Sequence, residues 1–556
     1  MFGIAMKFGS DLLLEVLESE GVRYIFGNPG TTEMPIMHSL RRHPDLRYVL
    51  GLQEAAVVAM ADGFAKASGE TAFVNLHTVG GLGHAMGALQ HSAIAKTPML
   101  VTAGQQDTRH GFMNPLLYGD VLKMAEPAVK WSREVQHPDQ IPALIRRGLQ
   151  DCRTPPRGPI FLSLPIDILT AETRVEAGLG SAISRGSSAG GLEELARALA
   201  AVEVGRLAIV SGDEVAVSDA ASQVVEIAEM LGCRVLGPSW PGSMSFPTDH
   251  PLWSGNLPSS ADGMRAALGE YDAVFVVGED PFLSYLYTPG GAVPHGCKLF
   301  QLSEDATQIG RTYAAALGCV GYLKPSLAAL SALLIEAAAP LRDAARSLYQ
   351  LAAAARVNAL RDLDSRLMSE SRQTSITPFV AAGSTLKAVG PAIAVVDEAP
   401  ATMHHIRSFM TRFAVRKYFF MRSAILGWGL PAAVGVSLGL GSDPVVALLG
   451  DGSALYTPQG LWTAAKLKLP VTFVIMNNSE YNILKRYSVA QGYEHEGNST
   501  IPGMELVDPT IDFGALATAF GLSACKVTRV EEIEEAVRAG IHSGSPNLVE
   551  LVITRE

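Results

Sequence analysis

The sequence has few cysteines, no basic run and no long hydrophobic stretch, and each shortage excludes a class of protein. Its five cysteines among 556 residues lie far apart and include no CxxC pair, so neither a disulfide framework nor a structural zinc site is expected. The formal net charge is −11, which argues against a surface that binds nucleic acid. Apolar stretches are too short and too rich in glycine to cross a bilayer. We therefore expect a soluble cytoplasmic protein.

What is abundant is apolar sequence arranged in short blocks. Hydrophobic residues make up 48% of the chain and charged residues 18%, as in packed globular proteins. A chain of 556 residues is too long for one hydrophobic core, so several domains are expected. Short apolar runs alternate with helical patterns, which is typical of buried parallel strands. The sequence thus predicts an α/β protein with three doubly wound parallel-sheet domains, at residues 1–177, 190–340 and 375–556.

The expected strands fall into three sets. They lie at residues 24–26, 47–50, 72–76, 99–102 and 159–162; at 207–210, 234–236, 273–277 and 298–302; and at 393–396, 444–449, 470–476 and 548–552. The stretch 178–191, rich in Gly, Ser and Ala, predicts a linker. Residues 337–372 have helical spacing, and residues 371–377 predict a connector that ends in a helix cap.

Two motifs near the C-terminus predict a site for a metal and a phosphate group. Gly450-Asp451-Gly452-Ser453 closes one apolar run, and Asn477-Asn478 closes the next. Open α/β sheets bind ligands at the carboxyl ends of their strands. Glycines let the backbone approach a phosphate, and Asp451 with Asn478 offers the oxygen ligands that Mg²⁺ prefers. The glycine motif alone is equally typical of a plain turn, but the two motifs together favour the site.

On these motifs the chain resembles the thiamine-diphosphate-dependent decarboxylase and acetohydroxyacid synthase superfamily. The resemblance implies thiamine diphosphate and Mg²⁺ as cofactors. It implies Asp451 and Asn478 as side-chain ligands of the metal, and Glu480 as a ligand through its backbone carbonyl. The cofactor-binding positions that it implies beside them are Gly452, Ser453 and Tyr481.

Glu54 is the candidate for activating the cofactor. A carboxylate bonded to the aminopyrimidine favours the tautomer that deprotonates the thiazolium ring, although a Glu at a helix start alone more often balances the helix dipole. The resemblance implies that residues 427–433 grip the pyrimidine and that Ala424 and Leu426 also bind the cofactor. Leu426 falls at the bulky apolar position that forces the two rings of the cofactor into a V shape. A Thr-Ser pair that contacts the diphosphate in the family is replaced by Pro400-Ala401. Only the backbone N–H of Ala401 is left to make that contact. The family also implies a homodimer or homotetramer with the active site at a subunit interface.

The substrate side resembles the benzoylformate decarboxylase subfamily, beginning with Phe26-Gly27-Asn28-Pro29-Gly30. That resemblance places Thr31 at the substrate carboxylate and His77 at proton transfer. Leu117 and Leu484 match apolar walls of the substrate pocket. The second catalytic histidine of the subfamily falls on Tyr285, whose phenol is a poor proton shuttle at neutral pH. His84, His91, His110, His404 and His405 show no metal-ligand spacing and are interpreted as surface or packing residues.

The expected function is decarboxylation of a benzoylformate-like 2-oxo acid through an enamine intermediate, with carboligase activity. Tyr285 favours an alternative, a dedicated carboligase or lyase that resembles acetolactate synthase or 2-hydroxyacyl-CoA lyase. A non-catalytic relative is a third possibility, against which Glu54, Asp451 and Asn478 all argue. The expected partners are a 2-oxo acid or aldehyde substrate, with no nucleic acid and no membrane. The middle domain shows no GxGxxG dinucleotide fingerprint.

Overall fold

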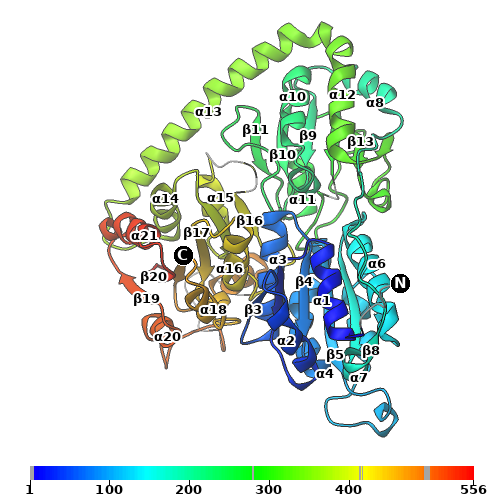
Figure 1. The fold of residues 1–556 in the computed structure, drawn as a ribbon. Helices are drawn as coiled ribbons and strands as arrows, with labels where there is room; N and C mark the ends of the chain where they lie inside the picture. Colours follow the sequence, from blue (N-terminus) through cyan, green and yellow to red (C-terminus); the bar gives the residue numbers. More distant parts are fainter. Residues whose placement is uncertain (1–5, 279–280, 412–414, 416, 494–500, 556) are drawn as a thin grey trace.

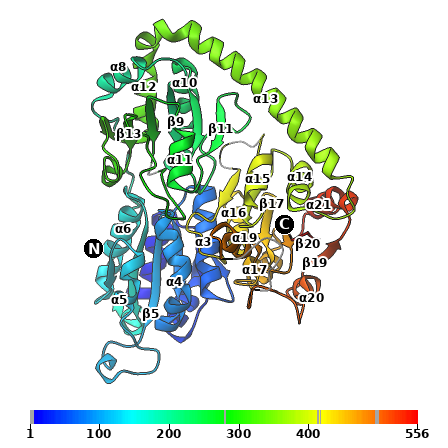
Figure 2. The same ribbon diagram turned by 180° about the vertical axis from the view of Figure 1, so that it is seen from behind.

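The chain folds around three parallel β-sheets of six strands each. The computed structural model describes residues 6–278, 281–411, 415, 417–493 and 501–555. Figure 1 shows the N-terminal sheet in blue and cyan, the middle sheet in green and the C-terminal sheet in yellow to red. The view from behind shows helices on both faces of the sheets (Figure 2). This confirms the predicted α/β fold with three doubly wound domains.

The N-terminal sheet has the order β3-β2-β4-β5-β7-β6. Its strands are β2 (Tyr24–Gly27), β3 (Arg47–Leu50), β4 (Ala72–Leu76), β5 (Met99–Gln105), β6 (Ser132–Glu134) and β7 (Pro159–Pro165). Helix α3 (Glu54–Ser68) follows β3, and α4 (Thr78–Ile94) follows β4. The loops after β2, β3 and β4 therefore open at one edge of the sheet, because all these strands are parallel.

The middle sheet has the order β11-β10-β9-β12-β13-β14. Its strands are β9 (Leu207–Ser211), β10 (Arg234–Gly237), β11 (Trp253–Asn256), β12 (Ala273–Val277), β13 (Lys298–Ser303) and β14 (Leu317–Val320). No helix or strand forms between β8 (Glu172–Thr173) and α8 (Leu192–Ala200), where the linker is predicted. Helix α13 (Arg342–Glu370) then runs along the outside from the middle domain to the C-terminal domain (Figure 1).

The C-terminal sheet has the order β16-β15-β17-β18-β20-β19. Its strands are β15 (Ala394–Glu398), β16 (Tyr418–Phe420), β17 (Val445–Gly450), β18 (Val471–Asn477), β19 (Ser523–Val527) and β20 (Asn547–Val552). The predicted cap is present, since the Thr377 hydroxyl oxygen accepts a hydrogen bond from the Val380 N–H at 3.2 Å. It begins helix α14 (Pro378–Val389). All strands expected from the sequence are thus found.

Helix α3 packs directly on helix α16 (Gly429–Gly439), which joins the N-terminal and C-terminal domains. Two glycines make this close approach possible. A Cβ atom on Gly63 would lie 2.3 Å from the Ala432 carbonyl oxygen, and one on Gly435 would lie 1.8 Å from that of Met60. Any larger residue would therefore push the two helices apart.

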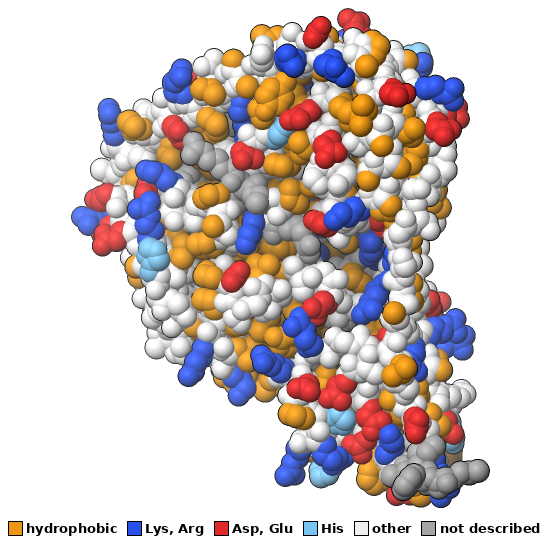
Figure 3. Space-filling model, turned by 45° about the horizontal axis from the view of Figure 1, so that its top comes forward, with side chains coloured by type: hydrophobic (Ala, Val, Ile, Leu, Met, Phe, Trp, Pro, Cys, Tyr) orange, Lys and Arg blue, Asp and Glu red, His pale blue; other side chains and the backbone are white. Residues whose placement is uncertain are grey.

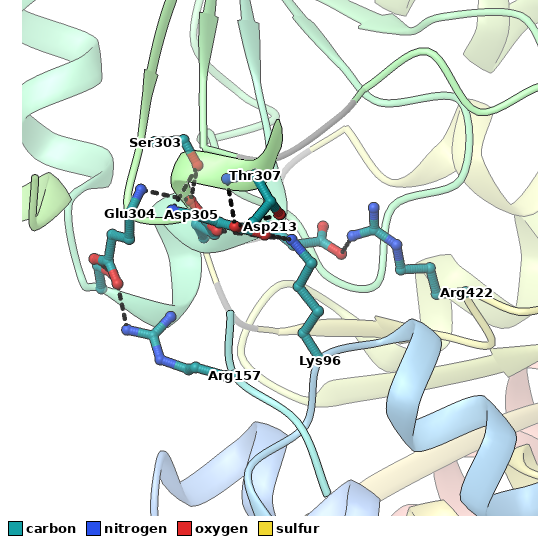
Figure 4. A network of polar contacts seen from close by, with 10 residues as sticks. Lys96, Arg157, Asp213, Ser303, Glu304, Asp305, Thr307 and Arg422 are labelled. Carbon is teal, nitrogen blue, oxygen red and sulfur yellow. Dashed lines mark hydrogen bonds and ion pairs between the residues drawn. The ribbon is translucent and has the colours of Figure 1, made fainter. Parts of the chain in front are cut away.

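A polar network joins all three domains (Figure 4). Asp305 follows β13, and its carboxylate binds Lys96 of the N-terminal domain at 3.0 Å. Glu304 binds Arg157 at 2.6 Å. On the other side, Asp213 binds Arg422 of the C-terminal domain at 2.5 Å. The carboxyl end of the middle sheet is therefore filled with acidic side chains that hold its neighbours.

The surface carries both signs of charge. On the face in Figure 3, acidic and basic side chains are interspersed, with apolar side chains between them. Within the described residues, no helix combines the length and the apolar character that crossing a membrane requires.

Candidate active site

The predicted metal ligands Asp451 and Asn478 follow the neighbouring strands β17 and β18. Asp451 begins the short helix α17 (Asp451–Ala454). Its carboxylate accepts hydrogen bonds from the backbone N–H groups of Gly452 and Ser479, both at 2.7 Å. One carboxylate thus ties the two loops together. Burial raises the pKa of Asp451 to about 6.

This carboxylate suits a divalent cation. It is 5% exposed, and the hydrogen bonds that hold it come from backbone N–H groups rather than from a cationic side chain. A buried carboxylate without a cation is costly, and bound Mg²⁺ would offset that cost. Asn478 contributes an amide oxygen, which also accepts the Glu480 N–H at 3.1 Å. The oxygen-rich donor set matches the preference of Mg²⁺.

The Glu480 side chain points to other partners. Its carboxylate accepts from the Asn482 amide at 2.9 Å and from the Lys485 ammonium at 2.5 Å. These partners occupy the Glu480 side chain, and metal binding through the Glu480 backbone carbonyl stays a prediction. Beside it, the Tyr481 ring lies against Gly452, where an added Cβ would meet the ring at 2.6 Å. Ser453 is buried in the same turn.

The segment from Ala424 to Gly429 is held by Glu398, which the sequence does not single out. This buried carboxylate accepts the Gly427 N–H at 2.6 Å and the Gly429 N–H at 2.6 Å. Burial raises the pKa of Glu398 to about 8. Ala424 has a left-handed backbone, with φ 58°, and Leu426 is partly buried against the core. An acidic residue at the end of an apolar strand, β15, is the only sequence signal for this role.

Glu54 is the first residue of α3, and its two carboxylate oxygens have different partners. One accepts the Asn28 amide N–H at 3.1 Å, and the other lies 3.2 Å from Nδ1 of His84. The carboxylate is buried at the carboxyl edge of the N-terminal sheet. The His84 side chain is 68% exposed, which agrees with its interpretation as a surface residue, and its ring also lies beside Glu54.

His77 lies in the same edge and is oriented by Glu33. Its Nδ1 is 2.7 Å from the Glu33 carboxylate and 3.2 Å from the Thr32 hydroxyl. Glu33 is fully buried and also accepts the Gly30 N–H at 2.9 Å. Glu33 belongs to the loop that carries Thr31, whose own side chain is exposed. No sequence pattern singles out Glu33, although it stands two residues after Thr31.

The expected pocket walls lie at the surface of the single chain. Leu117 and Leu484 are exposed, and Tyr285 is 60% exposed with its ring 5.8 Å from that of Trp240. Ala401 follows β15, and its carbonyl accepts a hydrogen bond from Arg486 at 3.4 Å. The hydrogen bonds thus group the site residues into a C-terminal cluster around Asp451 and two N-terminal clusters around Glu54 and His77.

Three family models match the chain in order. They describe the N-terminal binding domain of thiamine pyrophosphate enzymes at residues 7–115, the central domain at 192–330 and the C-terminal binding domain at 401–551. Thiamine pyrophosphate is the same compound as thiamine diphosphate. Glu54 and His77 lie in the match to the N-terminal binding domain, and Asp451 and Asn478 lie in the match to the C-terminal binding domain.

Relatives that match over nearly their full length support the same family. The chain is 33% identical to benzoylformate decarboxylase of Pseudomonas aeruginosa, over 98% of this chain and 99% of that protein. It is 25% identical to glyoxylate carboligase of Escherichia coli O157:H7, over 98% and 93%. The structure of 4-hydroxybenzoylformate decarboxylase from Rhodococcus jostii superposes with a TM-score of 0.85 at 28% identity, covering 99% and 100% of the two chains. The chain belongs to the thiamine pyrophosphate enzyme family, among its decarboxylases and carboligases.

Proposed function

We propose that this chain uses thiamine diphosphate and Mg²⁺ to decarboxylate a 2-oxo acid of the benzoylformate type, and that it also joins carbonyl compounds. The observation that carries this proposal is the arrangement of two side chains at the carboxyl edge of the N-terminal sheet. The loop residue Asn28 holds Glu54, and the buried residue Glu33 holds His77. The full-length similarity to benzoylformate decarboxylase supports the substrate class.

In this proposal Asp451, Asn478 and the Glu480 carbonyl hold the metal. The backbone of Gly452, with Ser453, Tyr481 and Ala401, binds the diphosphate, and Ala424 and Leu426 contact the pyrimidine. Bound thiamine diphosphate supplies the electron sink for cleavage beside a carbonyl. The Glu54 carboxylate hydrogen-bonds to the pyrimidine, and the Asn28 amide orients this carboxylate by donating a hydrogen bond to it.

Substrate recognition falls to Thr31, His77, Leu117, Leu484 and Tyr285. The Thr31 hydroxyl donates to the substrate carboxylate. Glu33 fixes the His77 ring, so that its Nε2 is available to move a proton. Leu117 and Leu484 offer the apolar contacts that an aryl group needs.

Tyr285 supports the alternative of a dedicated carboligase or lyase. It stands where the subfamily has a second histidine, and a phenol delivers a proton slowly at neutral pH. If the carbon left after loss of CO₂ is protonated slowly, a second carbonyl compound has more time to react with it. Tyr285→His should therefore raise the ratio of released aldehyde to ligation product. An unchanged ratio would remove Tyr285 as the determinant.

The proposed active unit is a homodimer or homotetramer in which Glu54 and Asp451 of one site come from different subunits. The supporting observation is that Leu117 and its neighbours are exposed in the single chain. A cluster of exposed apolar side chains marks a contact with another protein, and here a second subunit would cover it.

The decisive experiment combines substrate screening with one substitution. Purified protein with thiamine diphosphate and Mg²⁺ is tested on aryl and aliphatic 2-oxo acids, with CO₂ and ligation product followed together. Aryl 2-oxo acids should release CO₂, and Glu54→Gln should abolish turnover. Ligation of aldehydes without CO₂ from any oxo acid would favour the alternative. Chelation should remove activity reversibly, and activity that survives chelation would refute the metal site.

A further inference from the structure

Ala424 adopts a backbone conformation that residues with a side chain avoid. Its φ is 58°, in the left-handed region that costs free energy for every residue except glycine. Such strain persists where surrounding contacts enforce it, and it gathers at functional sites. The residues on both sides of Ala424 are tied together, because the Ser423 hydroxyl oxygen accepts the Ile425 N–H at 3.1 Å.

The Ser423 hydroxyl is itself held by His91, a fully buried residue of helix α4 in the N-terminal domain. Nδ1 of His91 lies 2.7 Å from the Ser423 hydroxyl oxygen. The Lys66 ammonium lies 3.3 Å from Nε2 of the same ring. An ammonium group only donates, so Nε2 is the acceptor and Nδ1 carries the proton. His91 therefore donates to Ser423, and burial lowers the pKa of His91, which favours this neutral form.

A second anchor grips the other end of the segment. The indole N–H of Trp428 donates to the Asp62 carboxylate at 2.8 Å, and Lys66 binds that carboxylate at 2.8 Å. Burial alone would raise the pKa of Asp62, but the Lys66 ammonium holds it well below its usual value. The His91 and Trp428 rings stack, with centroids 5.2 Å apart. Two residues of α3 and one of α4 thus fix Ser423 and Trp428, which flank the strained turn.

We propose that His91, acting through Ser423, is a positioning residue that holds Ala424 in its left-handed conformation and so presents the 424–426 backbone to the pyrimidine of thiamine diphosphate. This inference rests on the proposed function, which places Ala424 and Leu426 at the cofactor. It also assigns a role to the direct contact between the two domains. Helix α3 begins with the catalytic candidate Glu54, and helix α4 follows the catalytic candidate His77.

The test measures cofactor affinity rather than turnover. Thiamine diphosphate is titrated into full-length protein with Mg²⁺ present, and the dissociation constant is read from the quenching of tryptophan fluorescence. His91→Ala and Ser423→Ala should each weaken binding about tenfold, and the double variant should be no weaker than either single one, because both remove the same constraint. His91→Asn, which keeps an N–H donor, should recover part of the affinity.

Ala424→Gly makes the test specific. Glycine enters the left-handed region without strain, so adding Ala424→Gly to His91→Ala should restore affinity toward the wild-type value. Ser437→Ala is the matched control. It removes a buried hydroxyl of α16 that donates to the Asp443 carbonyl at 2.9 Å, and it should leave the dissociation constant unchanged.

Each result has a separate meaning. An unchanged dissociation constant in folded His91→Ala protein would overturn the positioning role, and so would a loss that Ala424→Gly fails to restore. If His91→Ala does not fold, the comparison of Ser423→Ala with Ser423→Ala/Ala424→Gly decides by the same criterion. Absence of saturable binding in the wild-type protein would instead refute the proposed function.

Discussion

Gly30 and Gly104 are positions where one added methyl group would disturb the His77 site. A Cβ atom on Gly30 would lie 2.2 Å from Nδ1 of His77, and one on Gly104 would lie 1.9 Å from the Glu33 carboxylate. Neither distance is compatible with the observed side-chain positions. The glycine of the loop after β2 is therefore required by the imidazole that packs on it.

Gly30→Ala should lower kcat about 100-fold, because a displacement of about 1 Å at a catalytic group has effects of that size. Gly80→Ala provides the matched control in the same region, since a Cβ there meets nothing within 4 Å. Steady-state kinetics of the two variants and a thermal unfolding curve of each are the measurements. Equal kcat values for both variants would show that His77 is not needed where it stands.

Sequence motifs single out candidate site residues, but they do not show what holds those residues in place. Asp451 and Asn478 each follow an apolar strand in a motif, so they can be picked out from one sequence. Glu33, Asn28, His84 and Glu398 act through partners that are distant in sequence, as the Asn28–Glu54 and Glu398–Gly427 bonds illustrate. A buried acid leaves no periodic signal, and its role becomes visible only once the loops are placed.

Glu398 makes stability depend on pH in a defined window. Its pKa in the folded protein is about 8, above the ordinary value of 4.5, so the native state binds this proton more tightly than the unfolded chain. The stability that it contributes is complete below pH 4.5 and falls as pH rises toward 8, by at most about 1.4 kcal/mol per pH unit. Burial raises the pKa of Asp397 to about 6. The lowered pKa values of His91, His404 and His405 add stability as pH rises through 6.5, so the comparison with Glu398→Gln isolates Glu398.

Melting temperatures between pH 6 and 8 test this directly. As pH rises from 6 to 8, the melting temperature of the wild-type protein should fall relative to that of Glu398→Gln. A constant difference between the two proteins over this range would assign the pH dependence to other groups.

At the scale of elements, the strands that sequence reasoning misses are edge strands. β6, β11, β14, β16 and β19 each border only one neighbour in their sheets. Three are largely exposed or half-exposed, as in β19, where four of five residues face solvent, and β6 and β16 have only three residues. A strand with one neighbour needs no continuous apolar run, so most of these strands lack the pattern that reveals central strands. The apolar run of β16 has only three residues, which is too short to stand out.

The carboxyl edge of the middle sheet joins this domain to its two neighbours. This edge, where open α/β sheets bind ligands, carries Asp213, Glu304 and Asp305 in pairs with other domains (Figure 4). Cationic side chains of the other two domains pair with all three carboxylates. These ion pairs therefore join the domains at this edge.

Arg157→Leu tests that role. It leaves Glu304, whose side chain is 2% exposed, buried without its cation, and loss of one partner of a buried pair costs about 3–5 kcal/mol. The melting temperature should fall clearly. The control Arg206→Leu removes a pair with Asp272 at 2.7 Å whose side chains are 44% and 62% exposed, and it should have little effect. Similar small shifts for both would mean that the junction does not stabilise the protein.

At the scale of the whole molecule, one segment has no explanation within a single chain. The residues between β5 and α5 (Val121–Ala125) project from the N-terminal domain at the bottom of Figure 1. Phe112 is 83% exposed and Leu116 is 90% exposed, and Leu117 stands beside them. Apolar side chains gathered on a projection are typical of a contact with another protein. The sequence names Leu117 as a pocket wall but gives no sign of how far the segment extends.

We expect this segment to dock on a second copy of the chain, as the proposed shared active site requires. Phe112→Asp/Leu116→Asp should reduce the native mass toward that of one chain in light scattering and should abolish turnover together with it, because charges at a packed contact oppose association. Leu351→Asp is the control, since Leu351 is 72% exposed on α13, away from this projection, and it should change neither property. A double variant that stays assembled and active would place the subunit contact elsewhere, whereas one that dissociates yet keeps full turnover would show that a single chain contains a complete active site.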